Sequence, residues 1–264
     1  MPRRARLDAE LVRRGLARSR EQAAALVAEG RVTVAGATAT KAATAVDAGT
    51  PLVVREPEGE VYASRGGHKL AGALDALGVD PAGRRALDAG ASTGGFTDVL
   101  LRRGAREVVA VDVGYGQLAW SLRTDPRVTV LDRTNVRSLT VEQVGEPVGL
   151  VVADLSFIPL GLVLPALLAC GTDDVELLPM VKPQFEVGKE RLPSGGVVRD
   201  PALRADAVRQ VAGQAAELGL GVAGVTASPL PGPSGNVEYF LHLRRGAPPL
   251  DEDRLAAAVA EGPQ

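Results

Sequence analysis

Charged side chains that follow short apolar runs are the residues best placed to do chemistry in this sequence. Five of them end consecutive predicted strands: Asp88, Asp112, Asp132, Asp154 and Lys182. The carboxyl ends of parallel strands meet at one edge of a sheet, where such sheets bind their ligands. Because a buried charge is costly unless it has a use, this alignment predicts a binding or catalytic site at that edge.

Lysine is rare in the chain, so each lysine in an ordered motif is informative. Of 30 basic residues only four are lysines, at positions 41, 69, 182 and 189. Arginine supplies positive charge but cannot lose its proton, whereas an amine can. Lys182 is therefore our candidate for a general base that takes a proton from a hydroxyl group. The alternative is a structural ion pair between Lys182 and Asp154.

Two further charged residues complete this candidate catalytic set. Lys69 lies in the first turn of a predicted helix, where a cation is unfavourable to the helix dipole. Glu238 lies near the start of the last predicted strand, which reaches the same sheet edge if that strand runs antiparallel to the others. We predict that Lys69, Asp154, Lys182 and Glu238 surround the reacting group.

The glycine-rich loop 90–95 is a candidate cofactor site. It connects a predicted strand to a predicted helix, so that backbone N–H groups and a helix N-terminus face a ligand. A dinucleotide fingerprint needs a glycine where Ser92 stands, and Asp88 would repel a pyrophosphate, so NAD is disfavoured. S-adenosylmethionine carries an ammonium and a sulfonium group instead, which suits the acids. A glycine turn without a ligand is the remaining alternative.

Several residues around this loop are predicted to contact the methyl donor. The candidate cofactor-binding residues are Asp88, Gly90, Ser92, Gly94, Gly95, Phe96, Asp112, Asp132 and Asp154. Asp112 follows Asp88 by 24 residues, about where an acid meets ribose hydroxyl groups. Asp132 is placed for the adenine edge, and Asp154 for the ammonium group of the donor. We predict no metal ligands.

The apolar runs place these residues on an α/β sheet. Strands are predicted at 85–88, 107–111, 128–131, 148–153, 175–181, 221–227 and 237–243. Helices are predicted at 95–103, 117–123, 138–143, 160–168, 201–218 and 251–261. This alternation is typical of a doubly wound, Rossmann-like parallel sheet. The short Pro- and Gly-rich connection 229–236 favours an antiparallel last strand.

The first part of the chain has a different character. Residues 1–41 carry nine Lys or Arg against four Asp or Glu, whereas residues 42–264 carry 21 against 28. Two helices, the first capped by Asp8 and the second by Ser19, and short strands at 31–34 and 52–54 predict a small α+β domain. Its charge indicates an anionic partner, with a merely solvated basic end as the alternative. We predict domains at 1–56 and 64–264, joined by an acidic linker at 57–63.

The small domain resembles a known RNA-binding fold. Its motifs are Arg6-Leu7-Asp8, Arg14-Gly15, Ser19-Arg20 and Gly30-Arg31-Val32-Thr33-Val34. They resemble the αL RNA-binding fold first known from a ribosomal small-subunit protein. The resemblance implies that Arg6, Arg18 and Arg20 face RNA phosphates.

The larger domain resembles the FtsJ-like ribose 2′-O-methyltransferases. The order Lys69, Asp154, Lys182, Glu238 matches the catalytic tetrad of that type. With Ser64-Arg65-Gly66-Gly67-His68-Lys69-Leu70 added, the whole chain is identified as a member of the TlyA, or haemolysin A, family. The resemblance implies S-adenosylmethionine-dependent 2′-O-methylation of cytidine ribose in 16S and 23S ribosomal RNA, with RNA in ribosomal subunits as the partner.

RNA contact is expected in both domains. The candidate RNA-binding residues are Arg4, Arg6, Arg18, Arg20, Arg65 and Phe157. A nucleotide in a duplex must leave its stack to be methylated, and Phe157 follows Asp154 closely enough to stack on the flipped base. For Tyr115 we favour packing or simple surface exposure.

Composition narrows the function classes. A single Cys170 excludes an intramolecular disulfide framework and fits a reducing compartment. The charged N-terminus lacks the apolar core of a signal peptide, and no apolar run approaches 18 residues, so we expect a cytoplasmic protein without a membrane span. We also expect a monomer. Two other classes stay open: an RNA-binding scaffold with an inactive pocket, and the pore-forming haemolysin of the family's older name.

Overall fold

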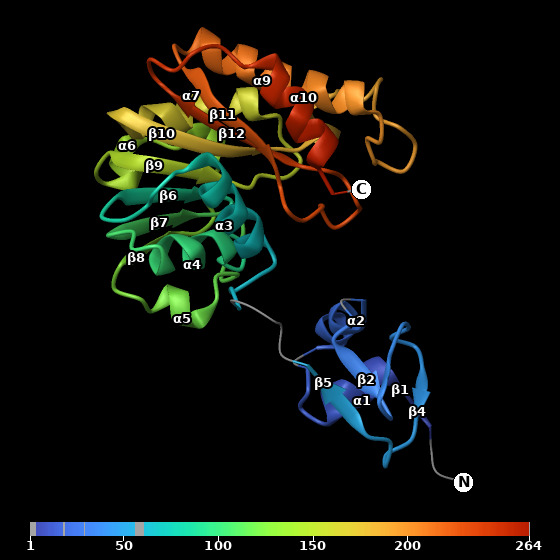
Figure 1. The fold of residues 1–264 in the computed structure, drawn as a ribbon. Helices are drawn as coiled ribbons and strands as arrows, with labels where there is room; N and C mark the ends of the chain where they lie inside the picture. Colours follow the sequence, from blue (N-terminus) through green and yellow to red (C-terminus); the bar gives the residue numbers. More distant parts are fainter. Residues whose placement is uncertain (1–3, 18, 29, 56–60, 264) are drawn as a thin grey trace. The chain divides into compact units, whose positions relative to one another are not determined.

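The computed structural model describes residues 4–17, 19–28, 30–55 and 61–263. The chain forms two compact units, residues 1–61 and 62–264. Figure 1 shows the first in blue and the second in colours from cyan to red. Each unit has a hydrophobic core of its own.

The smaller unit packs two helices against short strands. Its elements are β1 (Ala5–Arg6), α1 (Leu7–Arg13), α2 (Arg20–Ala28), β2 (Val32–Val34), β3 (Ala37–Thr38), β4 (Ala45–Val46) and β5 (Leu52–Val54). Leu11 of α1 and Leu26 of α2 belong to one buried cluster, which holds the helices together. Ser19 Oγ accepts from the Gln22 N–H at 3.1 Å, as predicted for the start of the second helix. The predicted cap of the first helix is wrong, because α1 begins before Asp8, with Arg6 at the N-cap position.

The larger unit alternates strands and helices. Its strands are β6 (Arg85–Ala89), β7 (Glu107–Val111), β8 (Val128–Leu131), β9 (Val148–Ala153), β10 (Gly171–Val181), β11 (Gly221–Ala227) and β12 (Tyr239–Arg244). Its helices are α3 (Gly66–Leu77), α4 (Gly95–Arg102), α5 (Trp120–Arg123), α6 (Val141–Val144), α7 (Leu164–Ala169), α8 (Pro183–Glu186), α9 (Pro201–Glu217) and α10 (Glu252–Glu261), with 3₁₀ turns at Val136–Ser138 and Leu160–Leu162.

These strands form one mixed sheet in the order β11-β12-β10-β9-β6-β7-β8. Its pairs from β10 to β8 are parallel, and β12 runs antiparallel to both neighbours, as predicted. The chain order reverses between β6 and β9, and ligands of such sheets bind at this switch point. Val181 at the end of β10 lies opposite Tyr239 at the start of β12, so the loop before β12 reaches the same edge.

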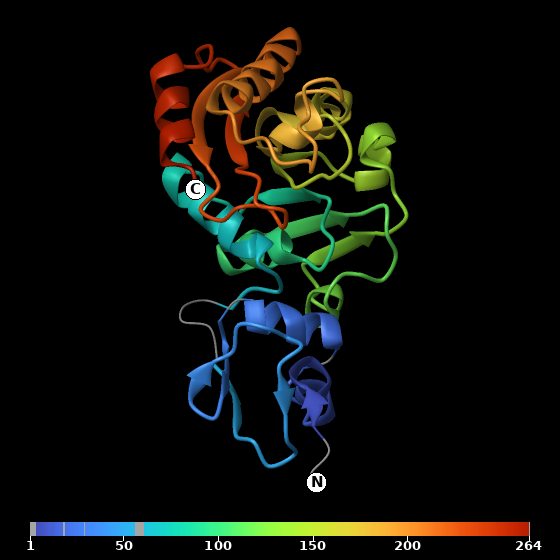
Figure 2. The same cartoon turned by 90° about the vertical axis from the view of Figure 1, so that its right-hand side faces the viewer.

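Both faces of the sheet are covered because successive strand residues point to opposite sides. Leu87 of β6 packs in the cluster that contains Val208 of α9, whereas Ala86 packs in the cluster that contains Val99 of α4. The two views show α9 and α4 on opposite sides of the sheet (Figure 1 and Figure 2). The sheet edge between these layers stays accessible.

Several predicted helices are shorter than expected for local reasons. The region 138–143 divides because Thr140 caps α6, its backbone N–H donating to Gln143 Oε1 at 3.1 Å. The region 160–168 divides into a 3₁₀ turn and α7, which has Pro165 in its first turn. No described helix is long and apolar enough to cross a bilayer.

Candidate active site

The glycine-rich loop makes close backbone contacts that a side chain would prevent. Gly90 has φ +89°, and a Cβ there would lie 2.5 Å from the backbone oxygen of Asp154. Asp112, which follows β7, accepts from the N–H of Ser92 at 2.8 Å and from the N–H of Gly114 at 2.7 Å. These contacts therefore hold the ends of β6, β7 and β9 close together around this loop.

Asp88 lies beneath the loop and is fully buried. Its Oδ2 accepts from the Thr97 hydroxyl at 2.6 Å, whereas its Oδ1 has no hydrogen-bond partner in the described part of the chain. Burial raises the pKa of Asp88 to about 7, and the neighbouring charge of Asp154 adds to this shift. The structure places Asp88 under the predicted cofactor site and outside the lining of the two cavities described next.

A pH dependence of stability follows from this buried acid. The unfolded chain loses the Asp88 proton near pH 4, whereas the folded chain loses it near pH 7. The folded state therefore binds this proton more tightly, and the free energy of unfolding falls as the pH rises from 4 to 7. Asp88→Asn keeps an acceptor for Thr97 but cannot ionise. We expect the melting temperature of this variant to rise relative to that of wild type as the pH increases from 5 to about 7. Above pH 7 the difference between the two melting temperatures should stay constant. A difference that stays constant from pH 5 to 8.5 would contradict the assignment.

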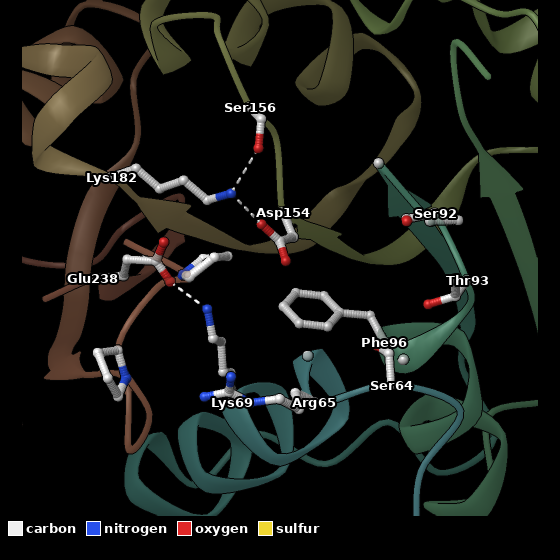
Figure 3. A pocket seen from close by; sticks show the side chains of 16 residues that line it. Ser64, Arg65, Lys69, Ser92, Thr93, Phe96, Asp154, Ser156, Lys182 and Glu238 are labelled. Carbon is white, nitrogen blue, oxygen red and sulfur yellow. Dashed lines mark hydrogen bonds and ion pairs between the residues drawn. The ribbon is translucent and has the colours of Figure 1, made fainter. Parts of the chain in front are cut away.

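The four predicted catalytic residues line one cavity of about 350 Å³. They come from α3, the loop after β9, the end of β10 and the loop before β12, and their charged groups converge in Figure 3. The remaining lining residues are Ser64, Arg65, Gly66, Gly90, Ala91, Ser92, Thr93, Gly95, Phe96, Ser156, Pro231 and Pro233. The structure thus brings the tetrad and most of the predicted cofactor loop to one place.

Two lysine–carboxylate ion pairs organise the tetrad (Figure 3). Lys69 Nζ lies 2.5 Å from Glu238 Oε2, and Glu238 is 1% exposed. Lys182 Nζ lies 2.6 Å from Asp154 Oδ1 and donates to Ser156 Oγ at 3.0 Å. Each lysine of the tetrad thus faces one carboxylate, which offsets the cost of grouping these polar side chains at a largely buried site. Ser156 was not predicted, since a serine in a loop carries no sequence signal for such a contact.

A second cavity of about 520 Å³ continues from the loop toward the end of β7. It shares Gly90, Ser92, Asp154 and Ser156 with the first cavity. Asp112 and Asn135 also line it. Asp132 does not; its carboxylate instead pairs with Arg123 Nη1 at 2.8 Å, and that hydrogen bond lowers the pKa of Asp132. The amides of Asn135 and Gln117 also line this cavity, and sequence reasoning missed both.

A third cavity of about 850 Å³ opens on the other side of Lys182 and Glu238. Phe157 and Phe185 line it, with ring centroids 5.2 Å apart. Phe157 is 90% exposed and therefore free to contact a ligand. Lys182, Glu238 and Ser156 line both this cavity and the first, so the tetrad lies at the boundary between the two.

In the smaller unit, the predicted RNA-binding arginines are held by carboxylates. Arg6 Nη2 and Arg20 Nη2 donate to Asp8 Oδ2 at 2.9 and 3.0 Å. These contacts, that of Arg6 first, hold the pKa of Asp8 well below its usual range. Arg4 Nε lies 3.7 Å from Asp47 Oδ1. Arg18 lies outside the described residues, and Arg65 lines the first cavity of the larger unit.

Comparisons with known proteins agree with this architecture. The family model for the FtsJ-like methyltransferase matches residues 62–245, and that for the S4 domain matches residues 5–52. The chain is 61% identical over 269 residues to the 16S/23S rRNA (cytidine-2′-O)-methyltransferase TlyA of Mycobacterium tuberculosis, covering 100% of both chains. It is 34% identical to hemolysin A of Brachyspira hyodysenteriae, covering 90% of this chain and 99% of that protein.

A solved structure with the hemolysin name, from Streptococcus thermophilus, extends the likeness to the fold. It is 37% identical, covers 99% of this chain and 96% of its own, and superposes with a TM-score of 0.79. The matching families, the full-length identity and the shared fold lead to one assignment. The chain belongs to the TlyA family of FtsJ-like methyltransferases.

Proposed function

We propose that this protein transfers the methyl group of S-adenosylmethionine to the 2′-oxygen of a cytidine ribose in 16S and 23S ribosomal RNA. The observation that carries the proposal is the pair of lysine–carboxylate contacts at the boundary of two cavities. One cavity contains the glycine-rich loop, and the other has an exposed aromatic ring at its wall. The name of the relative that is 61% identical supports the same substrate.

The residues of the first two cavities fit S-adenosylmethionine. The loop can approach the backbone of Asp154 because Gly90 has no side chain, and this brings the two cavity walls together. Asp112 would hold the ribose hydroxyls, Asn135 the adenine edge in place of Asp132, and Asp154 the ammonium group. Asp88, with one oxygen unpartnered, adds negative potential from below. When bound, the donor supplies an electrophilic methyl group, and these acids suit its positive charge.

The tetrad residues have separate roles in this proposal. Lys182 accepts the proton of the ribose hydroxyl, because a neutral amine within hydrogen-bond reach can act as a general base. Asp154 and Ser156 fix the direction of the Lys182 amine through contacts of 2.6 and 3.0 Å. Glu238 holds Lys69 on the opposite wall, where its amine orients the ribose. Phe157 stacks on the target base in the third cavity.

The smaller unit supplies affinity for RNA. We propose that residues 1–56 bind ribosomal RNA and residues 64–264 perform methyl transfer, with 57–63 as the connection; residues 57–60 lie outside those described. The S4 match and the arginines around Asp8 support this division. The substrate is RNA within ribosomal subunits, which places the enzyme in the cytoplasm, and it acts as a monomer.

Salt dependence tests the RNA-binding role. Each lost phosphate contact reduces the slope of log affinity against log salt by about 0.7–0.9. Arg6→Gln and Arg20→Gln together should therefore flatten the slope for ribosomal RNA, while calorimetry shows unchanged binding of S-adenosylhomocysteine. Glutamine can still donate to Asp8, so the buried carboxylate keeps a partner. As a control, Arg209→Gln on α9 should leave the slope as it is. An unchanged slope in the double variant would locate the RNA surface elsewhere.

Methyl transfer to isolated ribosomal subunits tests the activity itself. With tritiated S-adenosylmethionine, we expect label in 16S and 23S RNA of subunits that lack the modification, mapped to a cytidine 2′-oxygen. Label on a base would overturn the ribose assignment. RNA binding without any transfer would indicate the scaffold alternative, and leakage of dye from liposomes would indicate the pore-forming one.

A further inference from the structure

A buried acid outside the tetrad lies one helical turn after Lys182 in the chain. Glu186 is the last residue of α8, the single turn that follows Lys182, and it is 4% exposed. Its Oε1 accepts from the backbone N–H of Leu160 at 2.9 Å, and its Oε2 has no hydrogen-bond partner in the part of the chain that is described. Burial raises the pKa of Glu186 to about 7. Such an acid is costly to bury, so its position calls for a role.

Glu186 closes a series of contacts between two loops. The loop Asp154–Leu160 follows β9, and the turn Lys182–Glu186 follows β10, its parallel neighbour. At one end Lys182 contacts Asp154 and Ser156. In the middle the rings of Phe157 and Phe185 are 5.2 Å apart. At the far end the Leu160 N–H donates to Glu186, so the loops are joined along their whole length.

The loop that Glu186 holds is strained. Phe157 has φ +64°, a left-handed conformation that costs a residue other than glycine about 1–2 kcal/mol. Its side chain is 90% exposed, so burial does not stabilise this conformation. Strain of this kind persists only where the surrounding structure determines it. The buried hydrogen bond from Leu160, three residues further on, supplies such a constraint.

We propose that Glu186 is a positioning residue for methyl transfer: its hydrogen bond to Leu160 holds the loop 154–160 against the Lys182 turn. The bond thereby keeps Phe157 at the wall shared by the second and third cavities and Ser156 within hydrogen-bond reach of Lys182. The catalytic consequence rests on the proposed function. The role of Glu186 in holding the loop does not rest on the proposed function, and hydrogen exchange of the loop amides measures it directly.

Two variants distinguish the effect of the Glu186–Leu160 hydrogen bond from the effect of filling the space that the Glu186 side chain occupies. Glu186→Gln keeps an oxygen that can accept from Leu160, whereas Glu186→Leu fills the same space without an acceptor. We expect Glu186→Leu to lower kcat on ribosomal subunits by about 10–100-fold, since a misplacement near 1 Å costs about that much. Glu186→Gln should stay within about threefold of wild type. Binding of S-adenosylhomocysteine should be unchanged in both variants.

Hydrogen exchange reports the loop directly, without RNA or methyl transfer. We expect amides in residues 155–163 to exchange faster in Glu186→Leu and at the wild-type rate in Glu186→Gln. Glu176 is the matched control, because it is a partly buried carboxylate on β10 that binds Arg84 at 2.8 Å. Glu176→Gln should leave exchange at 155–163 unchanged. Faster exchange in this control would show that any carboxylate loss loosens the loop, and the proposal would fail.

Removing the donor gives an independent variant if Glu186→Leu does not fold. Leu160→Pro deletes the N–H at the first position of a 3₁₀ turn, where proline is tolerated, and Pro159 before it is already extended. Leu160 is 2% exposed in the core, so Leu160→Ala, which loses the same side chain but keeps the N–H, is the reference for this variant. Because Glu186→Leu and Leu160→Pro break the same bond, their effects on kcat should not add in the double variant. Additive effects, or a Glu186→Gln variant as impaired as Glu186→Leu, would overturn the proposal. If wild type fails to methylate RNA, the proposed function fails, and exchange at 155–163 still decides the role of Glu186.

Discussion

Lys182→Ala is expected to lower the rate of methyl transfer by about 10²–10⁴-fold, the usual contribution of a general base. A base acts on the hydroxyl proton in the transition state, so its loss should reduce turnover much more than ground-state affinity. Calorimetry with S-adenosylhomocysteine and filter binding with ribosomal RNA should therefore give dissociation constants close to wild type. Single-turnover methylation of subunits measures the rate itself.

Lys182→Arg distinguishes a base from a fixed positive charge. The guanidinium keeps the charge opposite Asp154 but cannot accept a proton, so we expect it to be nearly as inactive as alanine. This comparison matters because the 2.6 Å contact between Lys182 and Asp154 fits a structural ion pair as well as an oriented base. If arginine restores activity, Lys182 works by charge or position. If both variants also lose the cofactor, the ion pair with Asp154 is structural, and the base lies elsewhere.

Gly90→Ala is expected to weaken cofactor binding. Its φ of +89° disfavours any side chain, and a Cβ would lie 2.5 Å from the backbone oxygen of Asp154. Relief requires the loop after β6 or the loop after β9 to move, and both line the first two cavities. Strain of about 1–3 kcal/mol corresponds to binding that is roughly 5–150-fold weaker. Calorimetry with S-adenosylhomocysteine measures this loss.

A second glycine separates this effect from general strain. Gly78, which caps α3, also has a positive φ of +65°, but a Cβ there would meet no atom within 4 Å. Gly78→Ala should cost about 1 kcal/mol of stability and leave cofactor binding at the wild-type level. Wild-type affinity in Gly90→Ala would show that the ligand does not approach this loop.

The general position of the candidate site was predictable, because it depends on strand order alone. Strand-end residues such as Asp112 and Asp154 had to share an edge once the sheet was parallel. The antiparallel β12 then brought the loop containing Glu238 to the same edge. The sequence pattern shows at which end of a helix or strand a residue lies. That position was enough to predict that the tetrad residues lie together, and they line one cavity.

The direction and partners of individual side chains were less predictable. Asp132 follows its strand as expected, yet it binds Arg123, and Asn135 lines the cavity instead. Asp8 has the residue type of a helix cap but binds two arginines within its own unit. Ser156 and Glu186 owe their positions to loop geometry, which has no period and therefore leaves no pattern in the sequence.

The pair of Lys69 with Glu238 has a consequence for synthesis of the chain on the ribosome. The two residues are 169 positions apart, and one lies on the first helix of the larger unit, the other just before its last strand. The smaller unit and Lys69 leave the ribosome long before Glu238 is translated. The arginines that we propose to bind RNA are thus translated early, whereas the complete tetrad forms only when β12 inserts between β10 and β11. A chain that stops before Glu238, the residue ahead of β12, lacks the carboxylate partner of Lys69.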